Sequence, residues 1–176
     1  MDRVVVGFGF WIFVGIVSLA APAAAQDVDL SDATADEVKG EIKVNVKDAV
    51  RCLNERLDLD FTFADDGRSF VVVDQRGDSY SGTYRQKDPD GRKLVFKLDD
   101  ASQQDLADEW SRNIAVCTGV CEDGKARLKS MELTGKVTKS LEKLKIDWAF
   151  RGRNRACDQK YDGTFRWTGK GPLTLE

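Results

Sequence analysis

Three closely spaced arginines are the most distinctive chemical group in this chain. Arg151, Arg153 and Arg155 alternate with Gly152 and Asn154, directly after an apolar segment that ends at Phe150. Guanidinium groups bind phosphate and carboxylate groups through paired hydrogen bonds. If the segment is a turn, as its composition predicts, the three side chains form a candidate anion-binding site. The alternative is a charged, solvated hairpin tip that pairs with acidic groups elsewhere.

The chain lacks the residue that most enzymes use for proton transfer. Gly77-Asp78-Ser79 resembles the Gly-Asp-Ser block of a secreted hydrolase family, in which a strand delivers a serine nucleophile to a turn. That serine needs a base, normally a histidine, and the sequence contains no histidine. The same residues are typical of a hairpin turn. We therefore expect a protein that is not an enzyme, with no catalytic residue, cofactor or metal.

Residues 1–25 have the pattern of a secretory signal peptide. Arg3 precedes a long apolar run, and small residues follow up to Ala25. We expect cleavage before Gln26 and a periplasmic or secreted mature protein. The alternative is an uncleaved membrane anchor. No second apolar span follows, so no transmembrane segment is expected after cleavage.

The four cysteines are Cys52, Cys117, Cys121 and Cys157. An even number in an exported chain predicts disulfide bonds, and zinc is disfavoured without histidine. We expect Cys52 and Cys157 each to pair with one of the other two, because an i, i+4 pair on a helix directs its sulfurs poorly for a mutual bond. The alternative joins Cys117 to Cys121 and Cys52 to Cys157, and it requires the predicted helix to end before Cys117.

Charge is divided unevenly along the chain, although the formal net charge is only −3. Residues 26–124 contain 13 Lys and Arg against 23 Asp and Glu, whereas residues 125–170 contain 13 against 5. A basic half can meet an anionic surface or partner. The alternative is that the two halves attract each other within the fold. We expect no nucleic-acid partner.

Apolar and polar residues alternate with period two over much of the chain. The clearest segments are 57–63 and 144–150, and each predicts a strand with one buried face. The period becomes helical at Asp99, which predicts an amphipathic helix capped by Ser102. Residues 26–38 are acidic with few large apolar side chains, so we expect a flexible tail before one β-rich domain at 39–176.

The predicted fold is mainly β, with two antiparallel meanders forming a barrel-like or sandwich core and one central amphipathic α-helix packed on the sheet. Residues 59–63 match 146–150, and 80–85 match 161–166, so the domain is either internally duplicated or similar by chance. The Tyr-x-Gly-Thr-Tyr segment at 80–84 and its counterpart at 161–165 resemble segments of small exported lipocalin-like β-barrel proteins. That resemblance implies a barrel around a ligand.

Aromatic residues at inward strand positions are the candidate lining of such a barrel. They are Phe61, Phe63, Tyr84, Trp148, Phe150 and Trp167. A hollow interior would hold a small apolar ligand, and the alternative is a fully packed core. We therefore expect an exported, non-catalytic binding protein. The alternative function is an envelope interaction protein whose basic half meets an anionic surface or a protein partner.

Overall fold

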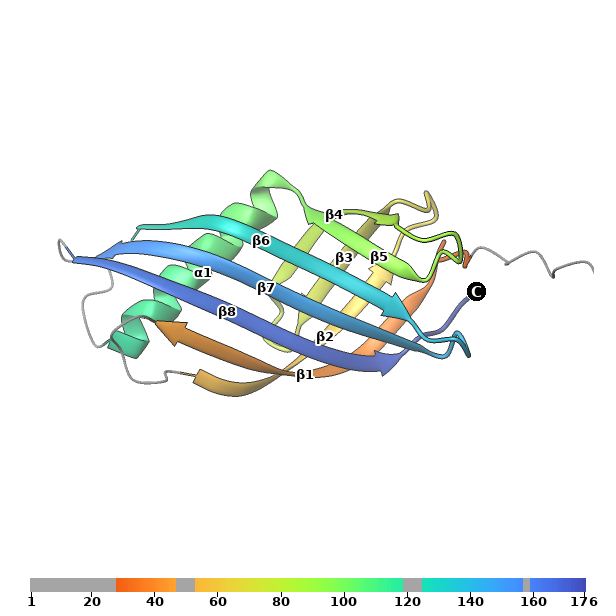
Figure 1. Cartoon of the computed structure of the whole chain (residues 1–176), viewed down its shortest axis with the longest axis horizontal. Coiled ribbons are helices and arrows are strands. Elements are labelled where there is room, and N and C mark those ends of the chain that lie inside the picture. Colours follow the sequence, from red (N-terminus) through yellow and green to blue (C-terminus); the bar gives the residue numbers. More distant parts are fainter. Residues whose placement is uncertain (1–27, 47–52, 119–124, 157–158) are drawn as a thin grey trace, which may run out of the picture.

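The computed structural model describes residues 28–46, 53–118, 125–156 and 159–176. Its strands follow one another in space as they do in sequence, and all neighbours are antiparallel. The last strand pairs with the first, so the sheet closes into a barrel (Figure 1). The elements are β1 (Thr34–Val46), β2 (Leu53–Phe63), β3 (Ser69–Asp74), β4 (Ser79–Gln86), β5 (Lys93–Leu98), α1 (Asp100–Thr118), β6 (Lys125–Val137), β7 (Lys143–Ala156) and β8 (Gln159–Pro172).

The predicted mainly-β fold with one central helix is confirmed, and the closed sheet decides for a barrel over a sandwich. Alternation along β7 shows why these residues form strands. Ile146, Trp148 and Phe150 are buried, whereas Lys145 and Asp147, which alternate with them, lie on the other face of the strand. Side chains with period two place one apolar face inside the barrel.

The segment 26–38 differs from the flexible tail that was expected. Its described part, from Val28 onward, is ordered on the barrel, and β1 already begins at Thr34. Apolar side chains between the acidic residues are buried there: Val28, Leu30, Ala33, Ala35 and Val38. The Phe63 N–H donates to the Ala33 carbonyl at 2.9 Å. Because the segment as a whole is acidic, its composition predicts a flexible tail and does not reveal this buried apolar face.

The strands differ in length, and this difference divides the barrel into two parts. β3, β4 and β5 have 6, 8 and 6 residues, whereas β1, β6, β7 and β8 have 13 or 14 and β2 has 11. Pairing of β5 with β6 ends at Phe96 and Leu133. We call the region enclosed by all the strands the eight-stranded part. The extended part is the region that β1, β2, β6, β7 and β8 form beyond it.

The helix α1 lies over the extended part, on the side where the short strands end (Figure 1). It packs against β4, β6 and β7. Its first turn is capped by Asp99, whose Oδ1 accepts the Ser102 N–H at 2.8 Å. Ser102 is therefore not the cap that the sequence predicted. It is buried inside the first turn, and its hydroxyl oxygen accepts the Ser81 N–H from β4 at 2.8 Å.

The matching segment pairs do not correspond to a duplicated topology. Residues 59–63 lie in β2 and residues 80–85 in β4, with β3 between them. Their counterparts at 146–150 and 161–166 lie in β7 and β8, which are direct neighbours. The matches reflect the same inward and outward alternation on different strands.

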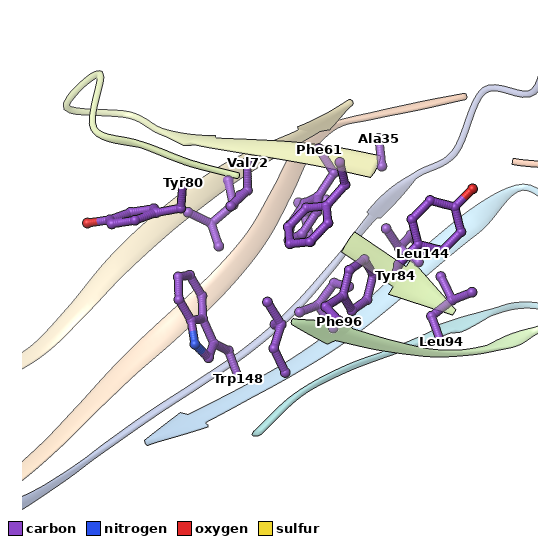
Figure 2. Close-up of a cluster of buried hydrophobic side chains, with 14 of the residues drawn as sticks. Ala35, Phe61, Val72, Tyr80, Tyr84, Leu94, Phe96, Leu144 and Trp148 are labelled. Carbon is purple, nitrogen blue, oxygen red and sulfur yellow. The ribbon is translucent and has the colours of Figure 1, made fainter. Parts of the chain in front are cut away.

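The eight-stranded part is filled by aromatic side chains (Figure 2). Phe96 is central, with ring centroids 4.9 Å from Phe70, 6.0 Å from Phe61, 6.2 Å from Tyr84 and 6.3 Å from Phe63. All these rings are at most 7% exposed. Interlocked rings at these separations are typical of a packed protein core.

Candidate functional site

The six aromatic residues proposed as lining are all buried, but they separate into two groups. Phe61, Phe63 and Tyr84 belong to the packed eight-stranded part. Trp148 and Trp167 face each other on β7 and β8 near the point where the short strands end, and the Phe150–Phe165 pair comes next along the same strands. In Figure 2, Trp148 and Tyr80 lie together at one end of the buried cluster, away from Tyr84. The sequence identified the inward positions correctly but could not separate the two groups.

The extended part has an apolar inner surface. Phe150 and Phe165 stack with ring centroids 4.4 Å apart, and Phe165 is 6.0 Å from Trp148. β1 and β2 add the buried side chains of Ile42, Val44 and Leu57. One pair further along, both inward positions are glycine, since Gly152 pairs with Gly163. These glycines place no side chain in the interior at that level.

Trp148 has a buried hydrogen-bond donor without a partner. Its side chain is 2% exposed, and its Nε1 has no hydrogen-bond partner. It is the only such side-chain atom among the described residues. The neighbouring Trp167 differs in this respect, because its Nε1 donates a hydrogen bond to the Leu57 carbonyl at 2.9 Å. A buried donor without an acceptor costs about 1–3 kcal/mol.

Three carboxylates meet where the β3–β4 hairpin approaches α1. Asp74, Asp78 and Glu109 each have an oxygen within 4.8 Å of the others, a spacing that could hold a metal ion. Protein groups already bind them, however. The Asp74 carboxylate accepts the N–H groups of Arg76 and Asp78 at 2.8 and 2.9 Å. The Tyr80 hydroxyl donates to Glu109 at 2.5 Å, and Nη1 of Arg76 lies 3.5 Å from the same carboxylate.

These contacts hold the β3–β4 hairpin against the helix, so we assign the three carboxylates a structural role. Burial raises the pKa of Tyr80 far above its ordinary value, and the hydrogen bond to Glu109 adds to the shift. The phenol therefore stays protonated and remains a donor to the carboxylate. Sequence reasoning missed this cluster, since its members come from two elements that only the fold brings together.

The arginine segment is not a turn, which corrects the sequence prediction. β7 continues through it to Ala156, and Arg151 and Arg153 are exposed on the outer face of that strand. Arg153 makes a two-pronged ion pair with Asp162 of β8, at 2.8 and 2.9 Å. Lys129 of β6 binds the same carboxylate at 2.8 Å. The side chain of Arg155 lies outside the described residues.

A shallow groove runs along the outer face beside this ion-pair cluster. Its volume is about 460 Å³, and its lining residues are Asn45, Lys129, Arg151, Gly152, Asp162, Gly163 and Thr164. The donors of Arg153 and Lys129 hold the pKa of the Asp162 carboxyl well below its usual range. Arg151 makes no ion pair within the described part of the chain. The contact between Lys129 and Asp162 depends on the register of β6, β7 and β8, which could not be predicted from the sequence.

Several sequence predictions lie outside the described residues. They are the signal peptide at 1–25 and the disulfide bonds, because Cys52, Cys121, Cys157 and the side chain of Cys117 are not described. In the described ranges, no helix combines the length and the apolar composition needed to cross a membrane. The chain matches no family model, and no curated protein matches it.

Proposed function

We propose that this chain is an exported, non-catalytic binding protein of lipocalin-like architecture that holds a small apolar ligand in the extended part of its barrel. One observation carries the proposal. Five long strands present an apolar inner surface beyond the reach of the short strands, and a single helix covers it. Small barrels with eight strands have interiors wide enough either to be filled by side chains or to hold one small ligand.

The distribution of side chains favours the extended part as the site. The eight-stranded part is filled by interlocked rings, so it would close the site at one end. Beyond the Phe150–Phe165 pair, the inward positions of β7 and β8 are the glycines Gly152 and Gly163. Apolar walls with few polar groups are the usual lining of a small-molecule site.

Filling the interior tests the proposal. Leucine at Gly163 adds an inward side chain, whereas leucine at Thr164 adds the same side chain on the outer face of β8. We expect the wild-type protein and T164L to bind N-phenyl-1-naphthylamine, an apolar fluorescent probe, and G163L to lose most of that binding. Native mass spectrometry of protein isolated from its own envelope fraction should show a lipid-sized adduct.

Two controls make the result decisive. Circular dichroism must show that G163L retains the barrel, and a smaller side chain, G163A, should bind the probe more tightly than G163L. Absence of probe binding by the folded wild-type protein would contradict the proposal.

A second candidate function follows from the outer groove, where Arg151 has no ion-pair partner in the described structure. The groove would bind an anionic group of an envelope surface, as the basic half suggests. We expect R151Q to weaken retention on vesicles that contain phosphatidylglycerol, and added salt to have the same effect. K145Q removes a charge from the same face of β7 outside the groove, and it should have a smaller effect. Equal effects of the two variants would contradict a specific groove.

A further inference from the structure

We propose that a row of five lysines on the outer face of the barrel binds a linear acidic polysaccharide, a flexible chain that carries an anionic group on its successive sugar units. We call this row the lysine ladder, and its members are Lys39, Lys170, Lys145, Lys136 and Lys93. The ladder lies outside the barrel, so this inference goes beyond the proposed apolar site and does not depend on it.

Strand register brings these lysines together from distant parts of the sequence. Lys39 of β1 is the direct partner of Lys170 on β8, which in turn is the partner of Lys145 on β7. Lys145 pairs with Lys136 of β6, and Lys136 pairs with Lys93 of β5. Directly paired residues lie on the same face of a sheet, and all five side chains are exposed. The row therefore crosses five neighbouring strands with a cation on each.

This arrangement is unfavourable for the protein without a ligand. Like charges directly opposite each other on neighbouring strands are destabilising. Lysines often protect the edge of a sheet from aggregation, but each of these strands has a neighbour on both sides in the closed barrel. Lys39 pairs with Glu37 at 2.9 Å, whereas the other four lysines make no ion pair within the described part of the chain. A bound polyanion would offset the repulsion along the row.

Acidic side chains border the ladder without interrupting it. Asp147, two residues from Lys145 on the same face, already binds Arg166 at 2.9 Å. Asp88 accepts the backbone N–H of Lys93 at 2.9 Å. An anionic chain that follows the row therefore meets a lysine on every strand that it crosses. Beside the row also lie Glu37, Glu41 and Asp58.

The curvature of the barrel favours a flexible chain over a flat membrane. From β5 to β1, the row covers four of the eight steps around the closed sheet, so Lys93 and Lys39 are half the circumference apart. A planar bilayer would meet only the middle of such a row, whereas a flexible polyanion can bend around it. Neighbouring strands are about 4.8 Å apart, close to the length of one sugar unit.

A surface depression adjoins the β1 end of the ladder. Its volume is about 360 Å³, and Lys39, Lys43 and Arg166 contribute cations to its lining, together with the carboxylate of Glu41. The depression gives a chain that follows the ladder room to continue between β1 and β8.

The absence of exposed rings disfavours a single-stranded nucleic acid as the partner. Proteins that bind such strands without sequence preference stack the bases on aromatic side chains. Among the described residues, the large apolar side chains that are exposed are Val71 and Leu141, and neither is aromatic. Ammonium groups without a stacking platform suit the sulfate and carboxylate groups of a polysaccharide.

Binding to heparin, a sulfated polysaccharide, tests the proposal. We expect K136Q and K145Q each to weaken binding about twofold to fivefold, the range that one exposed ion pair supplies. The combined variant K93Q/K136Q/K145Q/K170Q should weaken it at least about tenfold. R151Q removes one charge from the same face of β7 outside the ladder, so it is the matched control and should have a smaller effect than K145Q. Because the substitutions relieve repulsion, the thermal midpoints should be no lower than that of the wild type.

Further probes identify the partner. A heparin octasaccharide should bind more tightly than the disaccharide, because only the longer chain reaches lysines on several strands. At equal ionic strength, oligothymidylate and vesicles that contain phosphatidylglycerol should depend less than heparin on the ladder lysines.

Each contrary result overturns the proposal. Equal effects of K145Q and R151Q on heparin binding would show that net charge alone is recognised. Equal affinities for the disaccharide and the octasaccharide would contradict a chain that follows the row. If the combined variant loses vesicle or oligothymidylate binding and keeps heparin binding, the partner is not a polysaccharide. Absence of heparin binding by the folded wild-type protein would refute the ladder as a binding surface, while the apolar site is tested separately.

Discussion

At the scale of single residues, Trp167 shows how glycines allow this interior to close. Its ring lies close to two glycines. A Cβ added at Gly40 would lie 2.4 Å from ring atom Cε2, and one added at Gly169 would lie 2.3 Å from Cη2. The ring crosses β1 in this way, and its N–H reaches the Leu57 carbonyl on β2. One side chain of β8 thereby contacts its neighbour β1 and is hydrogen-bonded to β2, the next strand.

Alanine at Gly40 should therefore destabilise the protein. The added methyl group must displace a fully buried ring, and overpacking of this kind costs typically about 1–3 kcal/mol. We expect a lower urea midpoint for G40A by equilibrium denaturation. E41A alters the next residue, on the exposed outer face, and should leave the midpoint nearly unchanged. Equal midpoints for G40A and the wild type would show that the ring can move without cost.

Tyr80 should make the free energy of unfolding depend on pH in the alkaline range. Burial, followed by the bond to Glu109, raises its pKa in the folded protein above the ordinary value of about 10. The unfolded chain therefore releases this proton first, so the stabilising contribution is present below about pH 10 and is lost as the pH rises further. Ultraviolet titration should show the Tyr80 phenol ionising only when the protein unfolds.

The matched variant is Y80F, which retains the ring and has no proton to release. Its free energy of unfolding should fall less steeply than that of the wild type between neutral pH and about pH 11. Parallel pH profiles for the two proteins would contradict the role assigned to the phenol.

At the scale of elements, Asp162 joins three strands on the outer face. It accepts hydrogen bonds from Arg153 of β7 and Lys129 of β6, which lower its pKa in the folded state. A lowered pKa stabilises the fold above the unfolded value of about 4, and this contribution is lost as the pH falls below it. D162N should be less stable than the wild type at neutral pH, and thermal melts should show the difference shrinking below about pH 4.

The same scale explains how α1 is held at its first turn. Asp99 caps the helix and also accepts a hydrogen bond from the Ser81 hydroxyl at 2.5 Å, so it connects the helix to β4. We expect D99A to speed amide deuterium exchange over residues 100–109, with the barrel strands unaffected. D100A changes an exposed acidic residue one position later and should leave exchange slow. Unchanged exchange in D99A would place the anchor of the helix elsewhere.

At the scale of the whole molecule, the alternating strands and the helix were predicted from the sequence, whereas the start of β1, the closure of the sheet and the strand pairing were not. Alternation at 57–63 and 144–150 predicted β2 and β7, because the side-chain period of a strand is local. Closure depends on β1 meeting β8, whose paired residues Lys39 and Lys170 lie at opposite ends of the domain. No local pattern encodes that contact.

The candidate site was predicted in part for the same reason. Inward aromatic positions such as Trp148 and Phe150 follow from alternation. That the Trp148 N–H has no hydrogen-bond partner is visible only when the neighbouring carbonyl groups are placed. Likewise, the composition of residues 151–155 predicted a turn, whereas the pairing of Arg153 with Asp162 extends β7 through it.

The cysteine pairing stays a prediction at this scale. We expect Cys52 and Cys157 each to be joined to one of Cys117 and Cys121, which would close long segments of chain and contribute about 2–4 kcal/mol each. Non-reducing peptide mapping of the protein decides the pattern. A peptide in which Cys117 and Cys121 are bonded only to each other would contradict our pairing, and free thiols would contradict both patterns.

The pairing of β1 with β8 has a consequence for the order of folding. Residues 39–46 cannot complete their ladder until residues 163–170 have emerged from the translocation machinery or the ribosome. Until then, β1 and β7 each present an unpaired edge, which is a template for association with other chains. Contacts between such distant segments also form slowly. The interval before the last strand arrives is therefore when this protein is most exposed to aggregation and has most need of a chaperone.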